Sequence, residues 1–168
     1  MGPGSKPQLA LDTNVLFDLA DGKDFAGTVL EFLTEQKAAI KVPPTVMVEL
    51  EYEISSQISP QKAKRAERAF QAIASWKMTP INLASVQRAV VREFSKTLQH
   101  AGVIPHDEFN DGCILAETAL SCLDFLLTSD THLLSIHRQR LNELFDEKSL
   151  YRVEAVSPRR LYSQLKRR

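Results

Sequence analysis

Two carboxylates in this sequence follow short apolar runs that are typical of buried strands. Asp12 comes directly after residues 9–11, and Asp130 comes two residues after the run "DFLLT" (124–128). Asp is also a common helix cap, so each acid taken alone is a candidate cap as well as a candidate ligand. In open parallel sheets, however, ligands bind beyond the carboxyl ends of the strands. The repeated pattern therefore favours one shared site over two unrelated caps.

Two further acids lie in apolar helical stretches. Glu49 lies in "TVMVELEYEIS", and Asp111 lies near the start of "NDGCILAETAL". A charged side chain among apolar neighbours is costly to bury unless it is paired or binds a metal. An ion pair for Glu49 and a capping role for Asp111 are the alternatives. Nearby acids compete with these two or add to them: Glu51 and Glu53 compete with Glu49, while Asp107 and Glu108 supply a candidate helix cap and an extra candidate ligand beside Asp111.

Four carboxylates at one sheet edge would repel one another unless a cation lay among them. Mg²⁺ and Mn²⁺ prefer carboxylate oxygens and water as ligands. Such a cation beside a phosphodiester polarises a phosphoryl oxygen, lowers the pKa of a bound water and stabilises the leaving oxygen. The sequence therefore predicts phosphodiester hydrolysis with Mg²⁺ or Mn²⁺ as cofactor, at a site formed by Asp12, Glu49, Asp111 and Asp130.

Other chemistries lack the residues they need. The six glycines form no phosphate-binding loop, and the four His and two Cys have no zinc-ligand spacing. An aspartyl nucleophile after the first strand would usually have a second Asp two residues on, where this chain has Asn14. His106 and His132 flank the acidic segments, and we interpret them as surface residues rather than as a general acid and base.

The elements that position the acids alternate along the chain. Strands are predicted at 9–11, 38–42, 78–83, 124–128 and 151–156, the third limited to a sheet edge by Pro80. Helices are predicted at about 25–37, 45–57, 60–76, 84–100, 108–121 and 131–146, and from 158 onward. Strands separated by helices are typical of a three-layer α/β/α fold with a largely parallel central sheet.

The overall composition is that of an ordinary globular domain. The chain has 168 residues, of which 43% are hydrophobic and 25% charged, and its net charge is zero. Residues 1–5 ("MGPGS") look like an expression-tag remnant, which leaves 6–168 as a single domain. The sequence shows no membrane-spanning run and no signal peptide, so we expect a cytoplasmic protein without a membrane partner. Cys113 and Cys122 are expected to stay unbridged.

Taken in order, the acidic segments resemble the motifs of PIN-domain nucleases. The matching segments are "LDTNVL" (11–16), "VMVELEY" (46–52), "NDGCILAETA" (110–119) and "LLTSDTHLL" (126–134), and the resemblance covers residues 8 to 165. It implies a PIN-like domain in which Asp12, Glu49, Asp111 and Asp130 bind the metal and are catalytic, with Asn14, Thr128 and Ser129 in supporting positions.

The resemblance also implies a five-stranded parallel sheet and endoribonuclease activity on single-stranded RNA. VapC-type toxins of toxin–antitoxin operons are the most populous branch of this family. A small antitoxin protein and a second copy of the chain are therefore candidate partners, although two long helices make the chain longer than a compact VapC toxin. The alternative function is that of a PIN-like scaffold that binds RNA or a protein partner without cutting, and the presence of all four acids favours the nuclease.

A neutral nuclease with an acidic site needs a basic rim to attract RNA. Residues 158–168 contain five basic groups and no acid, and further arginines follow Asp130. Solvation of helix faces is the alternative role for these side chains. The candidate RNA-binding residues are Arg138, Arg140, Arg159 and Arg160, with Lys166, Arg167 and Arg168 at the terminus.

Overall fold

The computed structural model describes residues 6–56 and 58–167, so the suggested tag remnant at 1–5 and Arg168 lie outside the described residues. Within them, five strands form one parallel sheet in the order β3-β2-β1-β4-β5. This confirms the predicted five-stranded parallel sheet. The strands are β1 (Gln8–Leu11), β2 (Ala39–Val42), β3 (Thr79–Pro80), β4 (Phe125–Leu127) and β5 (Glu154–Val156).

Helices connect successive strands, which is what parallel pairing requires. Between β1 and β2 lie α1 (Thr13–Ala20) and α2 (Asp24–Glu35), and between β2 and β3 lie α3 (Pro44–Ser55) and α4 (Pro60–Ser75). The remaining helices are α5 (Ser85–His100), α6 (Phe109–Leu120), α7 (Thr131–Ser135), α8 (Arg138–Glu147) and α9 (Pro158–Lys166). Among the described residues, no helix is long and apolar enough to cross a membrane.

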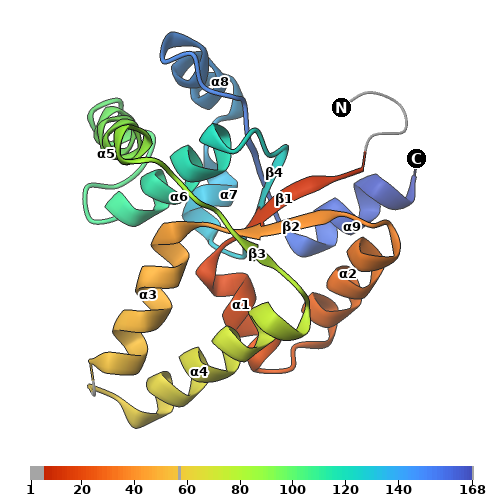
Figure 1. Cartoon of the computed structure of the whole chain (residues 1–168). Coiled ribbons are helices and arrows are strands. Elements are labelled where there is room, and N and C mark those ends of the chain that lie inside the picture. Colours follow the sequence, from red (N-terminus) through yellow and green to blue (C-terminus); the bar gives the residue numbers. More distant parts are fainter. Residues whose placement is uncertain (1–5, 57, 168) are drawn as a thin grey trace.

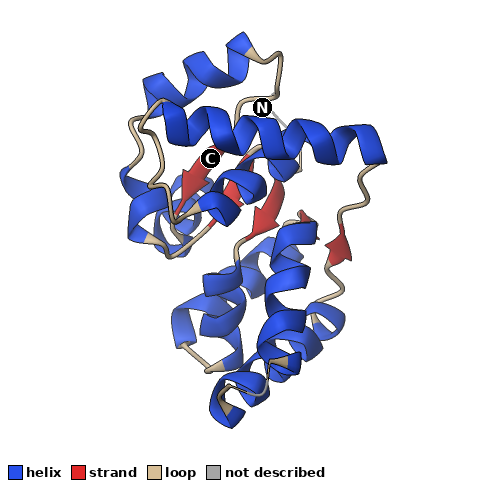
Figure 2. Cartoon of the chain, turned by 90° about the vertical axis from the view of Figure 1, so that its left-hand side faces the viewer, coloured by secondary structure: helices blue, strands red, loops and turns tan. Residues whose placement is uncertain are grey.

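Helices cover both faces of the sheet, which confirms the predicted three-layer fold. Figure 1 shows α5, α6 and α8 on one side of the strands and α1, α2 and α9 on the other, and Figure 2 shows the strands between two groups of helices. On one side, Phe94 of α5 stacks on Phe145 of α8 with ring centroids 5.0 Å apart. On the other, Phe32 of α2 meets Tyr162 of α9 edge-on at the same distance.

Three predicted elements differ from the structure in their extent. β3 comprises only Thr79–Pro80, because a proline cannot donate to a ladder and is tolerated only at the sheet edge. β5 begins at Glu154 rather than at residue 151, where it pairs with the start of the short β4. The helix predicted over 131–146 is divided into α7 and α8, because Ile136 and His137 adopt extended backbone angles.

The centre of the sheet is apolar on both faces. Leu9, Leu11, Leu126 and Leu127 are fully buried, as expected where helices cover a parallel sheet on both sides. Because β1 and β4 are adjacent and parallel, the residues that follow them emerge at the same edge. The buried core therefore fixes the positions of the residues that directly follow β1 and β4.

Candidate active site

The four predicted acids approach the carboxyl edge of the sheet from four helices. Asp12 occupies the N-cap position of α1, directly after β1, and Asp130 occupies that of α7, after β4. Glu49 lies in the second turn of α3, which follows β2, and Asp111 lies in the first turn of α6. Since β2, β1 and β4 are neighbours in the sheet, three of these helices start side by side.

Three carboxylates form the tightest group. Glu108, Asp111 and Asp130 are half-buried, and one oxygen of each lies within 4.8 Å of the others. Burial is the main cause that raises the pKa of Asp111, followed by a hydrogen bond with Glu108 and by the negative charges of Asp12, Glu108 and Asp130. Glu108, which the sequence offered only as an extra candidate ligand, thus belongs to the same group as Asp111 and Asp130.

Asp12 is the most deeply buried of these acids, with 3% of its surface exposed. Its Oδ2 accepts a hydrogen bond from the Thr128 hydroxyl at 2.7 Å, and its Oδ1 accepts one from the backbone N–H of Thr13 at 2.7 Å. Burial nevertheless raises the pKa of Asp12 to about 6, and the charges of Glu49 and Asp130 add to the effect. Asn14, a predicted supporting residue, places Nδ2 at 3.4 Å from Oδ2.

Asp130 is both a helix cap and a member of the acidic group. Its Oδ1 accepts hydrogen bonds from the backbone N–H groups of His132 at 2.7 Å and Leu133 at 3.1 Å. Its own N–H donates to the Thr128 hydroxyl oxygen at 2.9 Å, so Thr128 connects Asp12 with Asp130. The capping and ligand interpretations of a strand-end acid are therefore compatible, because capping occupies only one carboxylate oxygen.

Two residues that the sequence did not single out orient Glu49. The Thr13 hydroxyl donates a short hydrogen bond to Oε2, and Asn110 Nδ2 donates to Oε1 at 2.8 Å. In the sequence, Thr13 directly follows Asp12 and Asn110 directly precedes Asp111. This adjacency to predicted site residues was the only sequence feature that could have indicated their role. These hydrogen bonds hold the Glu49 carboxylate next to the first turns of α1 and α6, where Asp12 and Asp111 lie.

Glu117 is a buried acid that sequence reasoning missed. With 4% of its surface exposed, it accepts hydrogen bonds from the Thr45 N–H at 3.1 Å and the Thr45 hydroxyl at 2.7 Å. The N-cap residue of α3, Pro43, makes no side-chain capping bond, so Glu117 caps α3 from a neighbouring helix. Burial raises the pKa of Glu117 to about 7 despite these bonds. Glu117 thereby holds the first turn of the helix that carries Glu49.

Gly112 allows α6 to approach α5 closely beside Asp111. A Cβ at this position would overlap the Ser95 hydroxyl and lie 2.7 Å from Ile104 Cδ1. Across the same contact, the Ser95 hydroxyl donates to the carbonyl oxygen of Phe109 at 2.6 Å. The position of Asp111 therefore depends on the neighbouring Gly112, because any larger residue there would push α6 away from α5.

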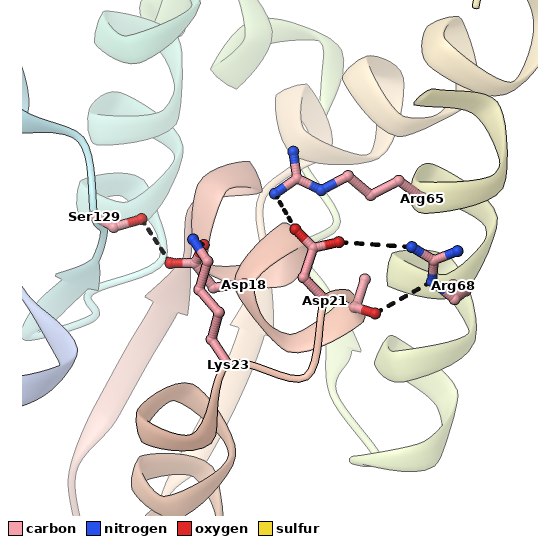
Figure 3. Close-up of polar contacts among 7 residues, drawn as sticks. Asp18, Asp21, Lys23, Arg65, Arg68 and Ser129 are labelled. Carbon is pink, nitrogen blue, oxygen red and sulfur yellow. Dashed lines mark hydrogen bonds and ion pairs between the residues drawn. The ribbon is translucent and has the colours of Figure 1, made fainter. Parts of the chain in front are cut away.

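The structure does not bring Ser129 to the acids it was expected to support. Its hydroxyl donates instead to Asp18 Oδ2 at 3.1 Å, on the later part of α1 (Figure 3). The two histidines are exposed, as expected, and His132 Nδ1 lies 3.5 Å from Glu108 Oε1. Cys113 and Cys122 are both free.

Most of the candidate RNA-binding arginines have partners within the protein. Arg138 and Arg160 both bind Glu154, at 3.1 Å and 3.3 Å. Arg140 pairs with Glu143 at 3.2 Å, and the Arg159 guanidinium lies 5.2 Å from the centre of the Phe25 ring. A role of these four arginines in RNA binding stays a prediction.

A family model decides how this arrangement is classified. The model of the PIN domain matches residues 9–139, which is most of the chain. The chain belongs to the PIN domain family. PIN domains are generally nucleases and typically use a divalent metal.

Solved structures with the same fold agree with this assignment of the PIN domain. VapBC2 from Rickettsia felis, bound to a DNA fragment from its promoter, aligns with a TM-score of 0.60 at 16% identity, over 89% of this chain and 98% of that chain. FitAcB from Neisseria gonorrhoeae aligns with a TM-score of 0.53 at 20% identity, over 89% and 97%. FitAB bound to the IR36 DNA fragment gives 0.52 at 18%, over 89% and 94%. A comparison with curated proteins finds no match.

The carboxylates of this PIN domain fit a divalent cation. We name Asp12, Glu49, Glu108, Asp111 and Asp130 the acidic cluster. Throughout residues 6–56 and 58–167, no Lys or Arg forms an ion pair with any of them. An oxygen-only donor set suits Mg²⁺ or Mn²⁺. The raised pKa values of Asp12 and Asp111 reflect burial and mutual repulsion, which a cation would relieve.

Proposed function

We propose that this PIN domain is a metal-dependent endoribonuclease that hydrolyses phosphodiester bonds of single-stranded RNA. The observation that supports it most is the acidic cluster, in which Glu108, Asp111 and Asp130 place oxygens within 4.8 Å of one another at the carboxyl edge of the sheet. No Lys or Arg of the described residues pairs with these three carboxylates, and a bound cation would offset the cost of burying their charges next to one another.

In this proposal, Asp111, Asp130, Glu108 and Asp12 hold Mg²⁺ or Mn²⁺. A bound cation of this kind supplies polarisation of a phosphoryl oxygen and acidification of a water. Thr128 orients Asp12 and Asp130 relative to each other through its two hydrogen bonds. Thr13 and Asn110 orient Glu49 towards the same space. Since the pKa of Asp111 is raised, metal binding near neutral pH should release a proton from this carboxyl.

We further propose that the chain is the toxin of a type II toxin–antitoxin pair, with a small antitoxin protein as its partner. The resemblance to VapC-type toxins supports this, and so does the fold shared with VapBC2 and FitAB, both of which were solved bound to DNA. The neighbouring gene provides the test. A small antitoxin-like reading frame whose product co-purifies with this chain is expected, whereas its absence would indicate an RNA-processing enzyme.

Cleavage of a fluorescent single-stranded RNA tests the nuclease proposal directly. Chelation should abolish cleavage, and Mn²⁺ or Mg²⁺ should restore it. Asp12→Asn should reduce the rate at least about 100-fold, because it removes ligand charge without changing core volume. The matched control is Asp21→Asn, at the other end of the same helix and paired with Arg65 and Arg68, which should cleave normally.

Both variants must be purified in parallel with the wild type, so that a contaminating nuclease would show in all three preparations. Unchanged cleavage by Asp12→Asn would contradict the proposed mechanism. Binding of RNA without any cleavage would instead support the silent scaffold.

A further inference from the structure

A groove of about 450 Å³ lies between the first turns of α3 and the facing sides of α5 and α6. Its walls include the apolar side chains of Val48, Leu83 and Phe109, and α5 adds Arg88 and Arg92. In Figure 1, α6 lies between α5 and α3, and residues of all three helices line the groove. The groove is open to solvent on the side of Val48, which is 61% exposed.

The groove adjoins the acidic cluster. Asn110 lines the groove and also donates the hydrogen bond to Glu49 Oε1 at 2.8 Å. Glu117 lines it as well, but its carboxylate is occupied by the two hydrogen bonds from Thr45. A chain bound in the groove would therefore lie next to the acidic cluster, on the side of Glu49.

Arg88 and Arg92 provide uncompensated positive charge along this groove. They are one helical turn apart on α5, so both guanidinium groups lie on the same face. Both are exposed, and within the described part of the chain neither forms an ion pair or a hydrogen bond through its side chain. By contrast, Arg138 and Arg160 share Glu154, and Arg140 has Glu143.

Resting on the nuclease function proposed above, we propose that this groove binds the segment of single-stranded RNA next to the cleaved bond. Arg88 and Arg92 bind phosphate oxygens, for which the planar guanidinium offers paired donors. The apolar wall formed by Val48, Leu83 and Phe109 receives a base. Alternating charged and apolar contacts of this kind match the alternation of phosphate and base along a single strand.

The charge contribution is tested by neutralising both arginines in the active protein. Arg88→Gln combined with Arg92→Gln should raise KM for a short single-stranded RNA about tenfold with little change in kcat. The dependence of log(kcat/KM) on log salt should flatten by about 1.4, since each phosphate contact on a single strand contributes about 0.7. The matched control is Lys62→Gln with Lys64→Gln, which removes two exposed charges from α4 outside the groove and should change neither quantity.

The groove itself is tested by placing charge on its wall. Val48→Lys should lower KM and Val48→Glu should raise it, because a charge at the open side of the groove attracts or repels the phosphates that flank the bound base. Tyr52 is the matched control position, since it is 60% exposed on the same helix and does not line the groove. Tyr52→Lys and Tyr52→Glu should leave KM unchanged.

The outcomes separate this proposal from the one it rests on. Wild-type protein that cleaves RNA, together with an unchanged KM and salt slope in the double arginine variant, would overturn the groove proposal alone. Wild-type protein that neither binds nor cleaves RNA would overturn both. Light scattering that shows a wild-type dimer converted to a monomer by Val48→Lys would assign the groove to an interface between two copies, and would also overturn the proposal.

Discussion

The two ends of α1 hold acids under opposite electrostatic conditions. At its C-terminal end, Asp21 pairs with Arg65 at 2.6 Å and with Arg68 at 3.5 Å, while Asp18 pairs with Lys23 (Figure 3). At its N-terminal end, Asp12 lies among the other acids of the acidic cluster, and the described residues offer these acids no Lys or Arg partner.

The difference shows that this fold can supply cations where acids serve its stability. α4 carries Arg65 and Arg68 to the end of α1, and the Arg65 guanidinium also lies 4.4 Å from the centre of the Phe17 ring. No such element reaches the acidic cluster within the described chain. Burial raises the pKa of Asp12, the charges of Glu49 and Asp130 add to the effect, and no Lys or Arg of the described residues pairs with Asp12 to oppose it. Charges left uncompensated at an energetic cost are typical of functional sites.

A Lys introduced next to the acidic cluster should remove the electrostatic difference between the two ends of α1. Asn14 is exposed and its Nδ2 lies 3.4 Å from Asp12 Oδ2, so Asn14→Lys would place an ammonium beside Asp12. We expect RNA cleavage to fall about 100-fold, because the ammonium competes with the metal. Thermal unfolding in chelator should at the same time shift to higher temperature. Asn14→Gln is the control, and full activity in Asn14→Lys would contradict the electrostatic interpretation.

The acidic cluster should also make the metal-free protein lose stability as pH rises. The pKa of Asp12 is about 6 in the folded protein, whereas its ordinary value, expected in the unfolded chain, is 3.8. Between pH 3.8 and about pH 6 the folded state therefore binds more protons than the unfolded state. Ionisation of Asp12 should therefore remove about 3 kcal/mol of unfolding free energy between about pH 4 and pH 7. Urea unfolding of the wild type and of Asp12→Asn, both in chelator, tests this. The difference between their unfolding free energies should change with pH. A constant difference would show that Asp12 is not destabilised.

A divalent cation should recover much of this stability. At a Mn²⁺ concentration of about 100 times its Kd, the folded state should gain about 2.7 kcal/mol. Glu108→Gln should weaken the gain because Glu108 belongs to the closest group of carboxylates. Asp146→Asn, which affects an exposed acid paired with Arg152, is the matched control. Equal thermal shifts in all three proteins would place the metal elsewhere.

Removing the acid at the compensated end should have the smallest effect. Asp21→Asn should lower the unfolding free energy by about 1 kcal/mol or less, since its partners are partly solvent-exposed. RNA cleavage should stay at the wild-type rate, with Glu67→Gln on the neighbouring helix as the control. A large loss of cleavage in Asp21→Asn would mean that the two ends of α1 do not differ in the way proposed.

Local patterns in the chain were sufficient to predict the α/β fold and the edge of the sheet where the acids lie. Alternating strands and helices imply a parallel sheet, and an acid that follows a buried strand must emerge at its carboxyl end. Asp12 and Asp130 could be placed together for this reason. The limits of β3 and β5 and the break between α7 and α8 were not predictable, because they depend on neighbouring strands and on two residues with extended backbone angles.

The contacts that complete the site depend on tertiary structure. Glu49 meets Thr13 and Asn110, which are 36 and 61 residues away, and Glu117 caps α3 from a distance of 72 residues. Likewise, sequence alone could not distinguish the arginines paired with Glu154 from Arg88 and Arg92, which form no ion pair within the described part of the chain. Periodicity reports how one element is buried, whereas side-chain pairing depends on how closely separate elements approach. At the α5–α6 contact, that approach is set by the missing side chain of Gly112.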